Sequence, residues 1–215
     1  MERRLDSLFA VPVAVVELDD LDCQSIIAKA EETVEWRPVT PGPQSLCLQS
    51  KNLSVLSDFP ELRETLLSET RMYADQVLRS PSASFALTTS WFTKTLPTGS
   101  TELHRHRNSW ISGCLYFDGG PDHGRFAVYG QNPAMEGIMV RPDEYNASNA
   151  VCYEYDTAPG KLILFPSNLQ HKITFHNTMT PRYSLAFNTY PTGLIGFGDS
   201  CVSITVDDVE LELTV

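Results

Sequence analysis

The chain has 215 residues, of which 42% are hydrophobic and 20% are charged, and its formal net charge is −11 at pH 7. This length favours one domain spanning residues 1–215, and the composition excludes a disordered acidic polymer. So acidic a chain lacks the basic surface that general nucleic-acid binding requires. No apolar run approaches the roughly 18 residues of a membrane helix, and the first residues lack the long apolar core of a signal peptide.

The cysteines point to a reducing compartment. Five are present, an odd number, and no two of them form a C-x-x-C pair. This usage favours free thiols over a disulfide framework or a zinc site. We therefore expect an acidic globular protein of the cytoplasm.

The first 80 residues predict one strand and two supporting helices. The apolar, β-branched stretch 9–16 has the composition of a strand. Asp19 and Asp20 offer N-caps for a first helix with apolar residues at helical spacing. Asp58 and Glu61 have the spacing of a capping box at the start of a second helix.

From Ser84 onward the pattern changes to short strands separated by turns. Alternating or compact apolar stretches occur at 85–93 and 111–117, and further ones follow towards the end of the chain. Many short strands after a helical start predict an α+β, mainly β fold. We expect a double-stranded β-helix, a jelly roll of the cupin kind, over residues 84–215, with the helices of residues 1–80 buttressing it.

One long segment, 130–159, is polar and rich in proline, asparagine, aspartate and glycine. So long a connection between strands is more often functional than a plain loop. We expect a mobile lid that orders when substrate binds. The alternative is an ordered hairpin in which residues 138–140 pair with residues 151–153.

Three histidines indicate a metal site. His104 and His106 follow a turn, and in an extended segment they share one face with Glu102. Two imidazoles on one face can bind one metal ion and leave room for a third ligand from a facing strand. His171, which follows the buried stretch 160–166 and a turn, is the candidate for that ligand.

An arginine that follows His171 in the sequence indicates an anion-binding site. Arg182 leads into an apolar strand and shares one strand face with Ser184. A buried arginine needs an anionic partner, and its planar fork suits a carboxylate, to which Ser184 can add a hydrogen bond. The alternative is a structural salt bridge to one of the 27 acidic residues.

The chain resembles the Fe(II)- and 2-oxoglutarate-dependent oxygenases, and more closely their short bacterial and phage branch related to prolyl hydroxylases. Four stretches carry the resemblance: 90–91, 104–116 with its His-Arg-His-Arg-Asn-Ser-Trp motif, 160–171 with its Leu-Phe-Pro-Ser motif, and 181–188. They span residues 90–188. The resemblance implies the same double-stranded β-helix that the strand pattern predicts.

The resemblance also implies an activity and a set of site residues. It implies a non-haem enzyme that uses Fe(II), O₂ and 2-oxoglutarate, and couples decarboxylation to succinate with hydroxylation of a substrate C–H bond. The substrate class suggested by analogy is a peptidyl proline or another amino-acid-like group, presented by a peptide or a small molecule. The implied Fe(II) ligands are His104, His106 and His171. The implied contacts of 2-oxoglutarate are Arg182, Ser184 and Tyr116.

Two residues of the implied site have alternatives. The wider family has a carboxylate at the position of His106, although the short branch also carries a histidine there. Glu102, on the same expected face, is the alternative ligand. Asn108 follows the motif closely enough to orient bound 2-oxoglutarate, or it forms a turn.

Two rival functions remain open. A cupin-type three-histidine metal enzyme would bind its substrate directly and would not use 2-oxoglutarate, but the pair Arg182 and Ser184 argues against it. A non-catalytic jelly-roll module would use the same side chains to recognise an anionic ligand. The sequence predicts neither the oxidised substrate nor the oligomeric state.

Overall fold

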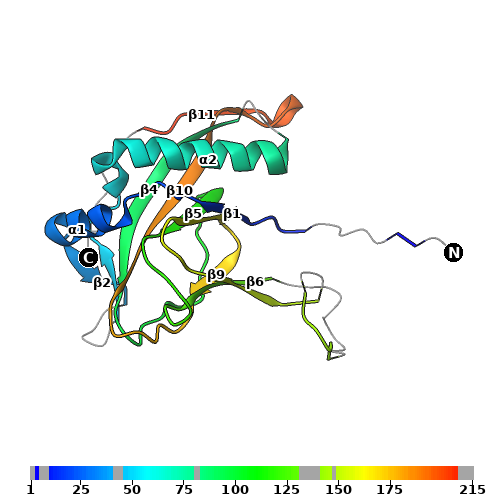
Figure 1. The fold of residues 1–215 in the computed structure, drawn as a ribbon. Helices are drawn as coiled ribbons and strands as arrows, with labels where there is room; N and C mark the ends of the chain where they lie inside the picture. The colour runs from blue at the N-terminus through cyan, green and yellow to red at the C-terminus, as the bar shows by residue number, and fades with distance from the viewer. Residues whose placement is uncertain are drawn as a thin grey trace.

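A computed structural model describes residues 3–4, 10–40, 46–79, 83–130, 141–146 and 149–207. Two antiparallel sheets and two α-helices dominate it (Figure 1). Among the described residues, no helix is both long and apolar enough to cross a bilayer. All five cysteines are free thiols, as their number and spacing predict.

The larger sheet, here called the major sheet, forms the centre of the molecule. Its strands in spatial order are β1 (Ala14–Glu17), β8 (Lys161–Pro166), β5 (Ile111–Tyr116), β10 (Arg182–Ile195), β4 (Ser84–Thr95), β3 (Cys47–Ser50) and β2 (Trp36–Pro38), and β11 (Val202–Ile204) pairs with the end of β10. The minor sheet has the order β7 (Cys152–Asp156), β6 (Arg125–Tyr129) and β9 (Gln170–Ile173).

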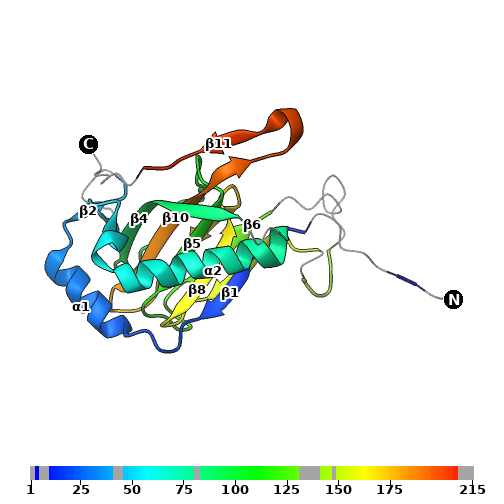
Figure 2. The same cartoon turned by 90° about the horizontal axis from the view of Figure 1, so that it is seen from above.

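Both α-helices cover one face of the major sheet. These are α1 (Cys23–Thr33) and α2 (Pro60–Leu78); the short 3₁₀ helices are η1 (Val55–Asp58) and η3 (Gly198–Ser200). Seen from above in Figure 2, α2 lies across the strands. Buried residues of α2, including Leu66, pack with Leu185 and Phe187 of β10 to form the helix-side core.

The minor sheet covers the other face of the major sheet, and a second core lies between them. Phe126 and Ile173 of the minor sheet pack there with Tyr116, Ile163 and Phe165 of the major sheet. Alternate residues of each central strand therefore serve different cores, as the period of two in strands requires. The prediction of a mainly β jelly roll buttressed by helices is confirmed.

The helix starts differ from the sequence-based prediction. The cap of α1 is Asp22, not Asp19 or Asp20, and its carboxylate accepts the Ser25 N–H at 3.1 Å. For α2 the expected capping box is wrong, because Asp58 ends η1 and Phe59 precedes the helix without a side-chain cap. The helix instead begins with Pro60, whose fixed φ suits a first helical position.

Part of the expected long connection is a strand. Within the segment 130–159, Cys152–Asp156 form β7, which pairs with β6 and sets Tyr153 opposite Val128. The loop is therefore shorter than expected. Residues 138–140 of the alternative hairpin lie outside the described residues, so the lid stays a prediction.

Gly113 is needed where two central strands meet. A methyl group at this position would overlap the Phe187 ring and lie 3.0 Å from Leu164 Cδ2. We expect Gly113→Ala to lower the free energy of unfolding by about 1–3 kcal/mol, because the core cannot accept the added carbon without strain. Gly130, whose Cβ would meet nothing within 4 Å, is the matched control. Urea unfolding of both alanine variants tests this, and equal stabilities would contradict it.

Asp118 makes stability depend on pH at the start of β10. Both of its carboxylate oxygens lie 3.1 Å from the Tyr183 amide nitrogen, which donates to them. Burial, the largest effect, raises the pKa of Asp118 to about 6, although the Tyr183 amide and Arg182 act in the opposite direction. Because the native state holds this proton more tightly than the unfolded state, the stabilisation is present below about pH 4 and is lost as the pH rises through about 6.

We therefore expect Asp118→Asn to raise the free energy of unfolding by about 1–2 kcal/mol near pH 8, and to have little effect near pH 4. The amide is neutral at both pH values and keeps an oxygen that accepts the Tyr183 amide. Denaturant titrations at the two pH values measure the effect, with the exposed Asp19→Asn as control. A gain of the same size at both pH values would rule out the titration of Asp118 as its cause.

Candidate metal centre

The three histidines predicted as metal ligands converge. One ring nitrogen from each of His104, His106 and His171 lies within 4.8 Å of the others. The ring centroids of His104 and His171 are 4.3 Å apart, and those of His106 and His171 are 5.1 Å apart. The structure thus brings His171 to two histidines that lie 65 and 67 residues before it in the sequence.

Backbone hydrogen bonds hold the two sequence segments side by side. The His104 amide donates to the His171 carbonyl at 3.0 Å, and the His171 amide donates back to the His104 carbonyl at 2.9 Å. The His106 amide donates to the Ser167 carbonyl at 2.9 Å. The segment is extended, as its spacing predicts, but it forms an isolated bridge to β9 and no regular strand.

Two of the rings have a defined tautomer. Nδ1 of His104 lies 2.8 Å from the Glu102 carbonyl oxygen, and Nδ1 of His171 lies 2.9 Å from that of Leu169. Because a carbonyl oxygen only accepts, each Nδ1 carries the proton and donates it. The Nε2 lone pairs of both rings remain available, and such backbone contacts are the usual means of orienting metal-binding histidines.

His106 and His171 are neutral at physiological pH. Burial, together with the charges of His171 and His104, lowers the pKa of His106 to about 3. Burial is also the main reason why the pKa of His171 falls to about 4, although its contact with the Leu169 carbonyl raises it. A metal ion therefore displaces no proton from these two rings near neutral pH.

The donor set fits Fe(II). Imidazole nitrogen suits iron among the divalent first-row metals, and three ligands leave other coordination positions open. Aromatic rings line the site: Trp91 lies 5.5 Å from His106, and Phe165 lies 4.7 Å from His171, measured between ring centroids. Glu102 is exposed and is not part of the converging group, to which it contributes only its backbone carbonyl.

Arg182 is the second element of the site. Its side chain is 0% exposed. Nη1 donates to the His123 carbonyl at 2.7 Å and Nη2 donates to the Thr95 hydroxyl at 2.9 Å, while Nε has no partner. Among the described residues, no carboxylate lies within 4.0 Å of its guanidinium, so the structural salt bridge considered above is not found there.

Tyr116 adds a second buried donor. It is 0% exposed, its hydroxyl has no nitrogen or oxygen partner and only the weakly bonding Cys114 thiol beside it, and its ring centroid lies 5.7 Å from Cζ of Arg182. Burial raises its pKa well above the usual value, so the hydroxyl keeps its proton. Ser184, also buried, is opposite Tyr116 in the strand register. A buried cation and a free hydroxyl together form a cradle for an anion.

Asn108 lies apart from this cradle. It is exposed in a bend and has a φ of 57°, a left-handed conformation that asparagine tolerates better than most residues. This conformation favours the turn-forming role among the two that the sequence left open.

Sequence analysis missed the groups that hold Arg182 in place. These are the Thr95 hydroxyl and the His123 carbonyl. Thr95 is directly opposite Arg182 in the register of β4 and β10. Thr95 and Arg182 are 87 residues apart in the sequence, so only the pairing of their two strands reveals the contact between them.

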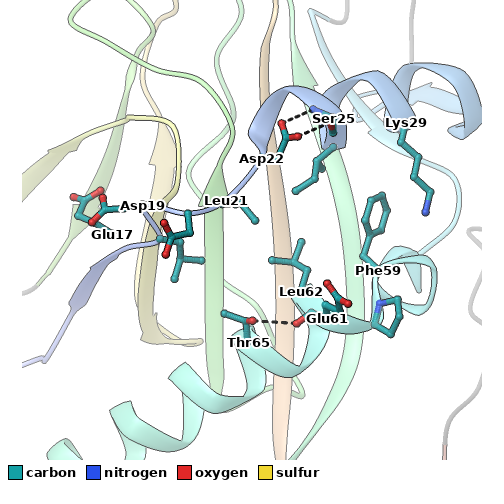
Figure 3. Close-up of a pocket in the computed structure, with 14 residues that line it drawn as sticks. Glu17, Asp19, Leu21, Asp22, Ser25, Lys29, Phe59, Glu61, Leu62 and Thr65 are labelled. Atoms are coloured by element: carbon teal, nitrogen blue, oxygen red, sulfur yellow. Dashed lines mark hydrogen bonds between the residues drawn. The ribbon is translucent and has the colours of Figure 1, made fainter.

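A separate hollow of about 850 Å³ lies between the β1–α1 connection and the two helices (Figure 3). It is on the helix side of the major sheet, and acidic residues line its rim. Asp22 is used to cap α1, and Glu17 pairs with Lys161 at 3.5 Å. Among the described residues, the histidine group is the only set of three or more side chains placed to share a metal ion.

Comparison with known proteins agrees with this geometry. Residues 89–188, which contain the histidines and Arg182, match a family model described as "Putative 2OG-Fe(II) oxygenase". A search of curated protein sequences finds no match.

Solved structures share the fold at low sequence identity. An oxidoreductase of the 2OG-Fe(II) oxygenase family from Burkholderia pseudomallei is 14% identical, with 82% of this chain and 83% of that chain covered and a TM-score of 0.57. HygX from Streptomyces hygroscopicus, solved with nickel, 2-oxoglutarate and hygromycin B, is 14% identical, with 85% and 84% covered and a TM-score of 0.55. A prolyl-4-hydroxylase from Pseudomonas putida is 14% identical, with 84% and 93% covered and a TM-score of 0.55.

The solved structures establish the shared fold, and the family model covers the strands and segments that carry the site. The resemblance recognised in the sequence is therefore confirmed. Residues 89–188 match the 2OG-Fe(II) oxygenase family model, and the chain shares the fold of solved structures described as such enzymes.

Proposed function

We propose that the protein is a dioxygenase that couples decarboxylation of 2-oxoglutarate to succinate with hydroxylation of a substrate C–H bond. The observation that carries the proposal is the combination of two features in one site: three converging histidines, and a buried arginine that has no carboxylate within 4.0 Å among the described residues. Fe(II), when bound, would activate O₂ and supply the oxidising chemistry.

In this proposal His104, His106 and His171 hold the metal. The free Nε2 lone pairs of His104 and His171 support it, because their Nδ1 atoms are occupied by backbone carbonyls. His106 is favoured over Glu102 as the third ligand, since its ring belongs to the converging group. A neutral triad binds a divalent cation with less electrostatic attraction than a triad that includes a carboxylate.

Arg182 binds the distal carboxylate of 2-oxoglutarate, and Tyr116 and Ser184 assist it. The unpartnered Nε of Arg182 and the free hydroxyl of Tyr116 support this role, because both are buried donors that an anion would satisfy. The Thr95 hydroxyl and the His123 carbonyl orient the guanidinium but do not neutralise it. Asn108 contributes at most from the rim, since it is exposed.

The substrate is proposed to be amino-acid-like, a peptidyl proline or a related group on a peptide or small molecule. The likeness to a prolyl-4-hydroxylase supports this choice. Trp91 places an apolar ring beside His106, a surface that suits a site for C–H oxidation.

An anaerobic Fe(II) binding assay, followed by succinate detection after O₂ is admitted, separates the three candidate functions. Iron binding with succinate formation from 2-oxoglutarate supports the proposal. Iron binding without any 2-oxoglutarate turnover would favour a cupin-type enzyme that binds its substrate directly. Absence of both would favour an anion-binding module.

Removal of one imidazole should strip the metal. We expect His104→Ala and His171→Ala each to weaken Fe(II) binding by more than about 100-fold, because loss of a hydrogen-bond partner of a ligand alone costs 10- to 100-fold. His106→Ala should behave similarly, while Glu102→Ala should retain the metal. Metal content after anaerobic loading measures all four variants. Retention in His106→Ala with loss in Glu102→Ala would instead identify Glu102 as the ligand.

Loss of the cation should affect the co-substrate and spare the metal. We expect Arg182→Ala to raise the apparent Michaelis constant for 2-oxoglutarate by about 100-fold or more, since breaking a buried charged pair costs about 3–5 kcal/mol. Arg182→Lys should recover only part of the affinity, because an ammonium group cannot form the planar fork. Arg125→Ala on the surface of β6 is the control. An unchanged Michaelis constant in Arg182→Ala would refute this role.

A further inference from the structure

A row of polar side chains crosses the major sheet beside the proposed co-substrate site. Arg37 of β2 is opposite Gln49 of β3 in the strand register. Gln49 is opposite Thr93 of β4, which is opposite Ser184 of β10. Ser184 is in turn opposite Tyr116 of β5. Directly opposed residues of antiparallel strands project from the same face, so these five side chains share one side of the sheet.

That side is the one that carries the site. Trp36, the neighbour of Arg37, packs against the helix-side core, and its ring centroid lies 6.3 Å from that of Tyr183. Adjacent residues of a strand point to opposite faces. Arg37 therefore faces away from the helices, on the same side as Arg182 and Ser184.

Among the described residues, the guanidinium of Arg37 forms no ion pair and its Nε–H group forms no hydrogen bond. Its side chain is partly buried, and its Nε is shielded from solvent with no hydrogen-bond partner. In the part of the chain that the structure describes, no carboxylate lies within 4.0 Å of it. An unsatisfied buried N–H group next to an uncompensated charge disfavours folding unless a ligand compensates it.

The neighbours of Arg37 can complete an anion site. Gln49 and Thr93 are partly buried, and within the described residues neither side chain has a hydrogen-bond partner. An amide and a hydroxyl beside a guanidinium can donate to the several acceptor lone pairs of a carboxylate or a phosphate. The row carries one positive charge and no negative charge.

The position of Arg37 relates it to the metal centre and separates it from the co-substrate cradle. Neighbouring strands are about 4.8 Å apart, so the backbone of β2 is about 10 Å from that of β4. Trp91, two residues from Thr93 on the same face of β4, contacts His106 with ring centroids 5.5 Å apart. The row thus runs from Tyr116 and Ser184 of the co-substrate cradle, through Thr93 and Gln49, to Arg37 at its far end.

We propose that Arg37, with Gln49 and Thr93, binds an anionic group of the substrate that is oxidised, either a carboxylate or a phosphate. This inference rests on the proposed function and deepens it by assigning the substrate class. The anionic group would anchor one end of the substrate at β2. The remainder would extend along the sheet towards the three histidines.

Nuclear magnetic resonance of arginine Nε–H groups tests the site directly. The probes are sodium acetate and inorganic phosphate, titrated at constant ionic strength into Zn(II)-loaded, ¹⁵N-labelled protein saturated with 2-oxoglutarate. Disappearance of a signal in Arg37→Gln assigns Arg37, and exposed Arg71 of α2 provides the reference. We expect the Arg37 signal to shift and saturate at concentrations at least about tenfold lower than any shift of Arg71.

The two probes distinguish the two sources of negative charge. Preference for acetate assigns a carboxylated substrate, and preference for phosphate assigns a phosphorylated one. Arg37→Lys should retain weaker binding, because it keeps the charge without the fork. An Arg37 signal that ignores both probes, or responds no more strongly than Arg71, would overturn the inference.

A titration of 2-oxoglutarate into the Zn(II)-loaded, ¹⁵N-labelled protein, before it is saturated, separates this inference from the proposed function. The Arg182 Nε–H signal reports 2-oxoglutarate binding independently, and Arg37→Gln should change 2-oxoglutarate affinity by less than about twofold because its site is separate. If Arg182 responds to 2-oxoglutarate while Arg37 ignores anions, only the substrate anchor fails. If Arg182 ignores 2-oxoglutarate while Arg37 binds anions, the anion site at Arg37 stands, but the proposed function and the assignment of that site to an oxidised substrate fail.

Discussion

The burial of Arg182, which forms no ion pair with any carboxylate that the structure describes, is the constraint on which the rest of the site depends. The two terminal nitrogens of Arg182 donate to neutral oxygens, those of the His123 backbone and the Thr95 hydroxyl. Neutral acceptors solvate a cation but leave its charge in place. Asp118 offsets part of that charge from a distance, and the space beside the guanidinium still favours an anion. Such an interior is stable only if the surrounding strands hold the acceptors rigidly, and it then favours a small anion over water.

Strand β10 supplies that rigidity through the division of its two faces. Leu185 and Phe187 are buried in the helix-side core, while Arg182 and Ser184 face the opposite sheet. Pairing with β4 on one side and β5 on the other fixes the strand along most of its length. The packing that stabilises the fold therefore also positions the binding groups. Mutations in the helix-side core are expected to shift Arg182 and Ser184 by displacing this strand.

The metal end of the site was accessible to sequence analysis because its signals are local. The spacing of His104 and His106 fixes a shared face in any extended segment, and His171 follows a recognisable buried strand. The contacts of Arg182 with Thr95, and the row from Arg37, depend on the register of strands far apart in the chain. No local pattern encodes that register, so these groups emerge only from the fold.

Two elements escaped prediction for different reasons. Strand β7 has no buried residue, because it lies at the edge of the minor sheet, and its composition therefore resembles that of a loop. At the start of α2, the spacing of Asp58 and Glu61 satisfied the rule for a capping box. The η1 turn occupies Asp58, however, and Pro60 begins the helix without side-chain assistance.

The two ends of the proposed co-substrate site belong to different layers. The histidines lie on β9 and on the segment bridged to it, whereas Arg182 lies on β10 of the major sheet. A dicarboxylate bound at both ends would act as a non-covalent cross-link between the layers. Its binding would restrict any relative sliding of the two sheets. The whole two-sheet core would therefore be more rigid when the site is occupied.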